Sequence, residues 1–142
     1  MSYRETSAWI TVIALGFASW SYFSFVVNQS AGLDALVAPS LPALINYTIT
    51  LISVLVLLHI TSAIIYRKTV DRALDEREKL IEIKASHYAG ILLGVLVVAA
   101  LVHTLLNPLI DSHFLFYAVL ASVIVSQLCE SVLKIYYHRR GI

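Results

Sequence analysis

The stretch Tyr66–His87, YRKTVDRALDEREKLIEIKASH, decides the fold because it interrupts an otherwise apolar chain. It holds eleven of the nineteen formally charged residues, six basic and five acidic, and it is called the charged hub below. Two long apolar segments precede the hub and two follow it. This layout is typical of a membrane protein whose polar connection lies between two pairs of spans.

The composition excludes an ordinary soluble domain, because 59% of the residues are hydrophobic and only 13% are charged. A bilayer core about 30 Å thick requires roughly 20 apolar residues in a helix. Four segments reach that length and predict an all-α, integral membrane four-helix bundle that forms one domain over residues 1–142. The predicted spans are Ala8–Val27, Ile45–Ile65, Tyr88–Leu106 and Phe114–Ile135.

The basic residues predict the orientation of the spans. All ten Lys and Arg residues lie at Arg4, in the hub or at the end of the chain, and none lies in the loops 28–44 and 107–113. The positive-inside rule therefore places the hub and both termini in the cytoplasm. An even number of spans also requires both termini to share one side.

The hub itself reads as a helix. Apolar residues recur at steps of three, four and seven from Val70 to Tyr88, and no Gly or Pro interrupts them. We expect a cytoplasmic helical extension that covers at least Asp75–Ala85 and continues unbroken into the third span. Its apolar stripe, with Leu74, Ile81 and Ala85, should face an extension of the second span.

Two patterns suggest close packing or binding within the spans. Ser86, Gly90 and Gly94 recur at four-residue steps in the third span, which lets two helix backbones approach inside lipid, either within one chain or between copies. The first span ends with Trp20, Tyr22, Phe23 and Phe25, which fit an outer aromatic belt, with a ring-lined pocket as the alternative.

Glu130 is the acidic residue that lies well inside a span, where a charge costs a few kcal/mol on insertion scales. It lies six residues before Tyr136, and His59 lies seven before Tyr66, so the two share a depth and a contact between them is possible. With Ser126 and Gln127 they form a candidate ligand- or proton-binding set. The structural alternatives are one interhelical hydrogen bond, or Glu130 reaching the interface near Lys134.

No metal site or cofactor is expected. His103, Asp111 and His113 gather near the outer face, but they lack the fixed spacing of a metal motif, and a hydrated cluster is the alternative. His59 and His103 lie at different depths, so they cannot hold one haem iron between them. The hub is nearly charge-balanced, which disfavours nucleic acid as a partner.

The hub motif resembles that of a known family. Asp75, Glu76, Arg77 and Glu78, followed by Ile81 and by Lys84-Ala85, are similar to a pattern in small bacterial predicted membrane proteins. Those proteins have four apolar spans with a D-E-R-D/E loop between the second and third. The resemblance implies this architecture and a bacterial cytoplasmic (inner) membrane, and it implies no activity.

Two functions stay open on the sequence alone. The favoured one is a non-catalytic multi-pass membrane module that oligomerises or binds membrane protein partners through its spans and cytoplasmic helix. The alternative is a small proton-coupled transporter or channel that uses Glu130 and His59. An enzyme is disfavoured because its only thiol nucleophile would be Cys129, at a depth where a thiolate is costly.

Overall fold

The computed structural model describes residues 3–32, 35–66, 76–107 and 113–140, and nearly all of these residues are helical. Each helix is long and apolar enough to cross a membrane, which confirms the all-α, four-span prediction. Each predicted span lies within one helix. The helices are α1 (Tyr3–Gln29), α2 (Leu41–Ile65), α3 (Glu76–Leu106) and α4 (Phe114–Arg140).

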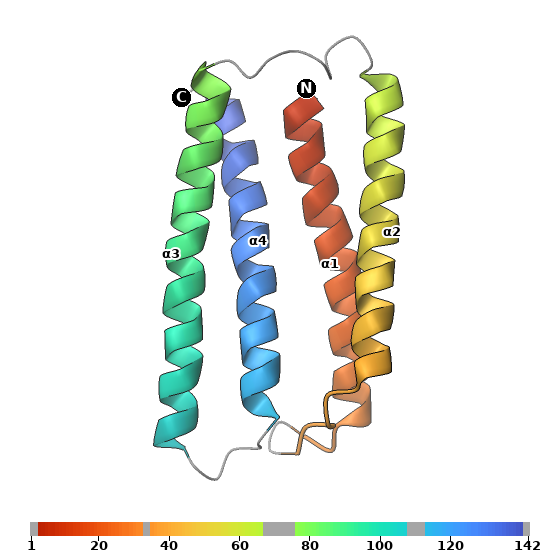
Figure 1. Ribbon diagram of the computed structural model, residues 1–142, viewed down its shortest axis with the longest axis vertical. Coiled ribbons are helices and arrows are strands. Elements are labelled where there is room, and N and C mark those ends of the chain that lie inside the picture. The colour runs from red at the N-terminus through yellow and green to blue at the C-terminus, as the bar shows by residue number, and fades with distance from the viewer. Residues whose placement is uncertain (1–2, 33–34, 67–75, 108–112, 141–142) are drawn as a thin grey trace.

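The helices stand side by side in an open row, in the order α2, α1, α4, α3 (Figure 1). Packing joins α2 to α1, α1 to α4 and α4 to α3, and over the described residues the backbones of α2 and α3 do not meet. The four helices of the predicted bundle are therefore arranged as an open row. Helices α1 and α4 lie in the middle, and α2 and α3 form the two edges.

The edge helices explain why the row does not close. On α2 only Ser62 is buried, and the rest of the helix presents mainly Ile, Leu and Val side chains outward. In lipid, such side chains gain little by exchanging acyl chains for another apolar helix, so α2 and α3 have no hydrophobic reason to meet.

Small side chains hold the pairs that do form. Helix α3 turns Ala85 and Ala89 inward, both almost completely buried, and the Ser126 hydroxyl of α4 donates a 2.8 Å hydrogen bond to the Ala89 carbonyl oxygen. Ala14 and Ala18 are buried in the same way on α1. These residues allow close approach of the backbones, which is how helices associate inside lipid.

The two ends of the row differ in chemistry. One end, here the charged end, carries the start of α1, the end of α2, the start of α3 and the end of α4 (top of Figure 1). The other, the aromatic end, has a core of Tyr22, Val26 and Tyr117, and the Tyr117 hydroxyl donates a 2.9 Å hydrogen bond to the Val37 carbonyl oxygen.

Helix α3 is longer than a bilayer is thick. Its 31 residues extend about 46 Å, whereas a hydrocarbon core measures about 30 Å. The helix runs unbroken from Glu76 through Ala85 into the third span, as expected, and Asp75 lies outside the described residues. Ile81 and Ala85 are buried in a helix that packs on α4, whereas Leu74 and the extension of the second span lie outside the described residues.

Candidate functional site

Arg4 crosses the charged end from α1 to α3. Its guanidinium lies 3.1 Å from a Glu78 carboxylate oxygen and 3.3 Å from one of Glu82. The backbones of α1 and α3 do not pack on each other, since α4 lies between them in the row. Arg4 therefore links the first helix to the third through side chains alone.

A second link joins α1 to α4. The Arg139 guanidinium lies 2.9 Å from a Glu5 carboxylate oxygen and 5.8 Å from the centre of the Trp9 ring, within cation–π range. The Glu5 side chain is mostly buried, so its charge needs this partner. The start of α1 is thus held by ion pairs to α3, through Arg4, and to α4, through Glu5.

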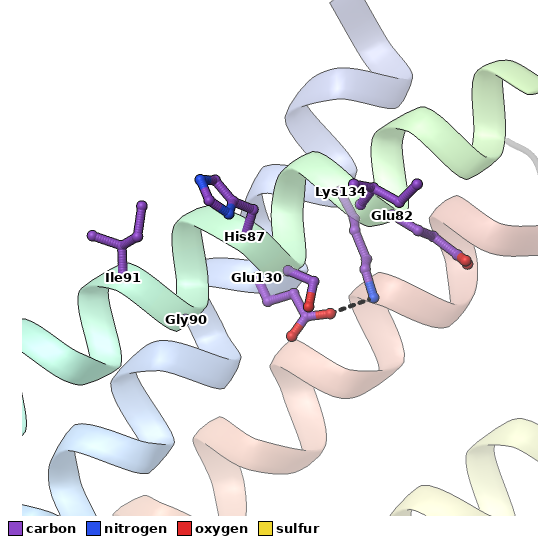
Figure 2. A pocket seen from close by; sticks show the side chains of 8 residues that line it. Glu82, His87, Gly90, Ile91, Glu130 and Lys134 are labelled. Carbon is purple, nitrogen blue, oxygen red and sulfur yellow. Dashed lines mark ion pairs between the residues drawn. The ribbon is translucent and has the colours of Figure 1, made fainter.

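Two hollows open between these charges. A wide groove of about 860 Å³ follows α3 past Ser86 and Gly90 and is bounded by Glu82, Glu130 and Lys134 (Figure 2). A smaller cavity of about 260 Å³ lies toward α1 and is lined by the same three charged residues together with Arg4 and Gln127, among others. The two hollows share Glu82, Glu130 and Lys134 as lining residues, and together they are called the depression at the charged end below.

Glu130 is paired within its own helix. One carboxylate oxygen lies 2.8 Å from the Lys134 ammonium, four residues on, as the dashed line in Figure 2 shows. This is the structural alternative that the sequence left open, Glu130 reaching toward Lys134. An ion pair reduces the cost of placing a carboxylate at this depth.

The contact between Glu130 and His59 that their equal depth made possible is not formed. His59 belongs to α2 and shares a 3.0 Å hydrogen bond with the Ser7 hydroxyl of α1, while its other ring nitrogen lies 2.9 Å from the Leu55 carbonyl oxygen. Because α1 stands between α2 and α4, equal depth does not bring the two side chains together. In place of a proton-exchanging pair of Glu130 with His59, Glu130 pairs with Lys134 and His59 pairs with Ser7.

The other two residues of that candidate set have different surroundings. Ser126 is buried and uses its hydroxyl for the bond to Ala89, so it is a packing residue. Gln127 is exposed and lines the smaller cavity beside Glu130. Of the four candidates, Glu130 and Gln127 therefore share one hollow, and His59 and Ser126 do not line either part of it.

The small-residue stripe of α3 is not covered by another described helix, although Ser86 and Gly90 line the groove beside α4. Ser86, Gly90 and Gly94 are exposed, and a methyl group added at either glycine would meet no described atom within 4 Å. Packing within one chain, one of the two options for this stripe, is therefore not observed. The reason is a shift of one residue: Ala85 and Ala89 take the α4 side, which leaves the next positions outside.

The described part of the hub motif lies in the first turn of α3. Glu76 and Arg77 are exposed, and Glu78 pairs with Arg4. Acidic side chains in a first helical turn are favoured by the helix dipole. This motif therefore helps to begin α3 and to hold α1.

Two of the three candidate metal residues, His103 and His113, are described by the structure. His103 stacks on Phe114 with ring centres 5.3 Å apart, and the Asn107 amide lies beside its ring. Asp111 lies outside the described residues. Among the described His, Cys, Asp and Glu side chains, no group of three lies close enough to hold a metal ion.

Arg4 is the residue that the sequence reasoning missed. It is the one cation ahead of the first span, and the positive-inside rule predicts that it lies on the same side as the five acidic residues of the hub. Opposite charges confined to one end of a small membrane protein tend to pair, and that signal was available.

The Arg4 link predicts a loss of stability on charge reversal. We expect Arg4→Glu to lower the free energy of unfolding by roughly 1–2 kcal/mol, because two partly exposed ion pairs become repulsions. Adding Glu82→Arg should restore part of the loss. Unfolding in mixed detergent and denaturing micelles measures it, with Lys79→Glu, on the exposed side of α3, as the charge-matched control. Equal losses in Arg4→Glu and Lys79→Glu would refute the link.

The charged end can hold water or a polar headgroup in its depression, but its ionic groups already neutralise one another in pairs. The Ser7 hydroxyl, which lines the smaller cavity, is held by its 3.0 Å hydrogen bond to the His59 ring. Comparison with family models, with curated proteins and with solved structures gives no match to this chain.

Proposed function

We propose that this chain is a non-catalytic, multi-pass membrane module that pairs with a second copy of itself through α3. The observation that carries the proposal is the open row. One edge of it, α3, presents a stripe of small residues, Ser86, Gly90 and Gly94, that no described part of the same chain covers.

A second copy fits this edge better than lipid does. Exposed glycines leave backbone uncovered, and close contact between two such stripes yields dispersion contacts that flexible acyl chains make less well. The stripe also opens into the groove that holds the Glu130–Lys134 pair (Figure 2). Covering the groove with protein would shield that pair from the lipid tails.

Symmetry favours a second copy over an unrelated partner. Two copies inserted in the same orientation place their α3 helices parallel, so a two-fold axis along the membrane normal brings Gly90 against Gly90. An isologous contact of this kind requires only one self-complementary surface. The stripe needs no matching partner surface elsewhere.

The orientation completes the proposal. The charged end, with the start of α3 projecting beyond the span, would lie in the cytoplasm, as the distribution of Lys and Arg predicts. The resemblance of the hub motif supports a bacterial inner membrane. In this arrangement a dimer would present two parallel α3 extensions to cytoplasmic partners.

The transporter alternative has less support. It relied on a contact between Glu130 and His59, and each of these residues has a separate partner. The hollows at the charged end share no lining residue with the pocket at the aromatic end. The geometry thus gives no reason to connect the two sides of the membrane.

The test is the mass and cross-linking of the protein in lipid nanodiscs. We expect a dimer, twice the chain mass of 15.7 kDa. With Cys129→Ser as background, Ser86→Cys should form a disulfide between copies on mild oxidation, because a contact along the stripe would bring the two Cβ atoms within the roughly 4 Å that a disulfide requires. Thr61→Cys, exposed on the opposite edge, is the control and should not. A monomeric mass, or cross-linking at Thr61 alone, would reject the proposal.

A further inference from the structure

A separate pocket lies at the aromatic end, between α1 and α2. It has a volume of about 380 Å³, within the range of roughly 300–1,000 Å³ that small-molecule sites occupy. Ala18 and Tyr22 of α1, both almost completely buried, form its floor, and Phe25 and Asn46 are exposed at its mouth.

Aromatic rings from both helices line this pocket. The rings of Tyr22 and Tyr47 lie 5.3 Å apart between centres and are tilted by 52°, and Phe25 adds a third ring. Offset and tilted ring pairs are the arrangement that aromatic groups prefer, so a further flat ring can extend the cluster favourably.

The polar groups of the pocket are uncharged. Its hydroxyl and amide groups come from both helices, and no lining residue carries a formal charge. The side chains of Asn46 and Tyr47 make no hydrogen bond to another described residue, so they keep free donors and acceptors. A charged molecule would lose its hydration here without gaining a counter-ion. The polar residues are Ser21, Tyr22, Ser40, Asn46, Tyr47 and Thr50.

We propose that this pocket binds a small, neutral, ring-containing molecule that carries one or two hydrogen-bonding groups. The rings would stack on its flat face, and Asn46 and Tyr47 would bond its polar group at the mouth. This site is independent of the α3 contact proposed above, because it lies on the α1–α2 side of the row.

An aromatic belt alone does not account for the pocket. Belt residues point outward into the headgroup layer, as Trp20 does with 77% of its surface exposed. Tyr22 retains only 5% of its surface, although it lies two residues further along the same helix. The aromatic run therefore divides into an outward belt residue and inward residues that shape a hollow.

Photolabelling in nanodiscs tests the proposal with a matched pair of probes. The neutral probe is para-(trifluoromethyl-diazirinyl)benzyl alcohol, and the charged one is the corresponding benzoate. We expect saturable labelling by the alcohol at peptides containing Phe25 and Asn46, at least about tenfold above labelling by the benzoate, because the site holds no cation.

Three variants locate the binding. Ala43→Trp should fill the pocket and abolish saturable labelling. Asn46→Leu, at the exposed mouth, should weaken it about fivefold through loss of a hydrogen bond without disturbing the fold. Trp20→Leu lies outside the pocket and should leave labelling unchanged. Unsaturable labelling, equal labelling by both probes, or full labelling of both Ala43→Trp and Asn46→Leu would overturn the proposal.

Discussion

A cysteine at Ala31 is expected to react almost completely with an impermeant maleimide added to intact spheroplasts, whereas one at Lys79 should stay unlabelled until the membrane is broken. Ala31 is exposed just beyond α1 at the aromatic end, and Lys79 is exposed near the start of α3 at the charged end. The difference should be all or none, because the bilayer stands between the two positions. Both variants need Cys129→Ser, so that the added cysteine is the sole thiol.

The physical basis is the cost of moving cations across a membrane. Every Lys and Arg of the chain lies at Arg4, in the hub or after Glu130, and the helix ends bring all the described ones to the charged end. Cationic flanks remain on the cytoplasmic side during insertion. A detergent-permeabilised sample is the control that shows both thiols to be reactive. Labelling of Lys79→Cys from outside would invert the topology and remove the cytoplasmic role of the hub.

The sequence was sufficient to predict the helices and their membrane character. Apolar runs of about twenty residues have few alternatives in a bilayer, where backbone groups must bond within the helix. The unbroken helix through Ala85 and Gly90 also followed, because no Gly or Pro lies between Pro42 and Gly90. Helix α1 extends beyond its predicted span at both ends, and α3 and α4 extend beyond theirs at the charged end, where polar residues continue the helix.

The order of the helices could not be predicted in the same way. Counting residues from the helix ends predicts the depth of Glu130 and His59 in the membrane. It does not predict where each helix stands in the plane of the membrane. Helix α1 separates their helices, so residues of equal depth never meet. Likewise, a stripe of small residues marks a surface suited to contact without saying which neighbour covers it.

The side of α3 that packs was decided by one step in register. Alanine and serine served as the small residues of the α3–α4 contact, through Ala85, Ala89 and Ser126. The glycines, which attract attention in a sequence, were left on the outer edge. The sequence shows that the Ser86–Gly90–Gly94 stripe has smaller side chains than the Ala85–Ala89 stripe. The α3–α4 contact, however, also depends on the hydrogen bond between Ser126 and Ala89.

Replacing Gly90 by leucine should separate the two copies while leaving the single chain slightly more stable. A Cβ added at Gly90 meets no described atom outside its own helix backbone within 4 Å, and removing a glycine from a helix stabilises the helix by about 0.8–1 kcal/mol. Between copies, however, the branched side chain would hold the α3 backbones apart. We expect the dissociation constant of the dimer to rise at least about thirtyfold, roughly 2 kcal/mol.

Gly16 provides the matched control for this substitution. It lies within α1, it is exposed, and an added Cβ likewise meets no described atom within 4 Å. Gly16→Leu should therefore give the same gain in helix stability and leave dimerisation unchanged. Mass measurement across a dilution series in nanodiscs or micelles gives the dissociation constant of the dimer, and thermal unfolding gives the stability of the chain. An unchanged dimer in Gly90→Leu would exclude α3 as the interface, and equal weakening in both variants would assign the contact to a surface that includes α1.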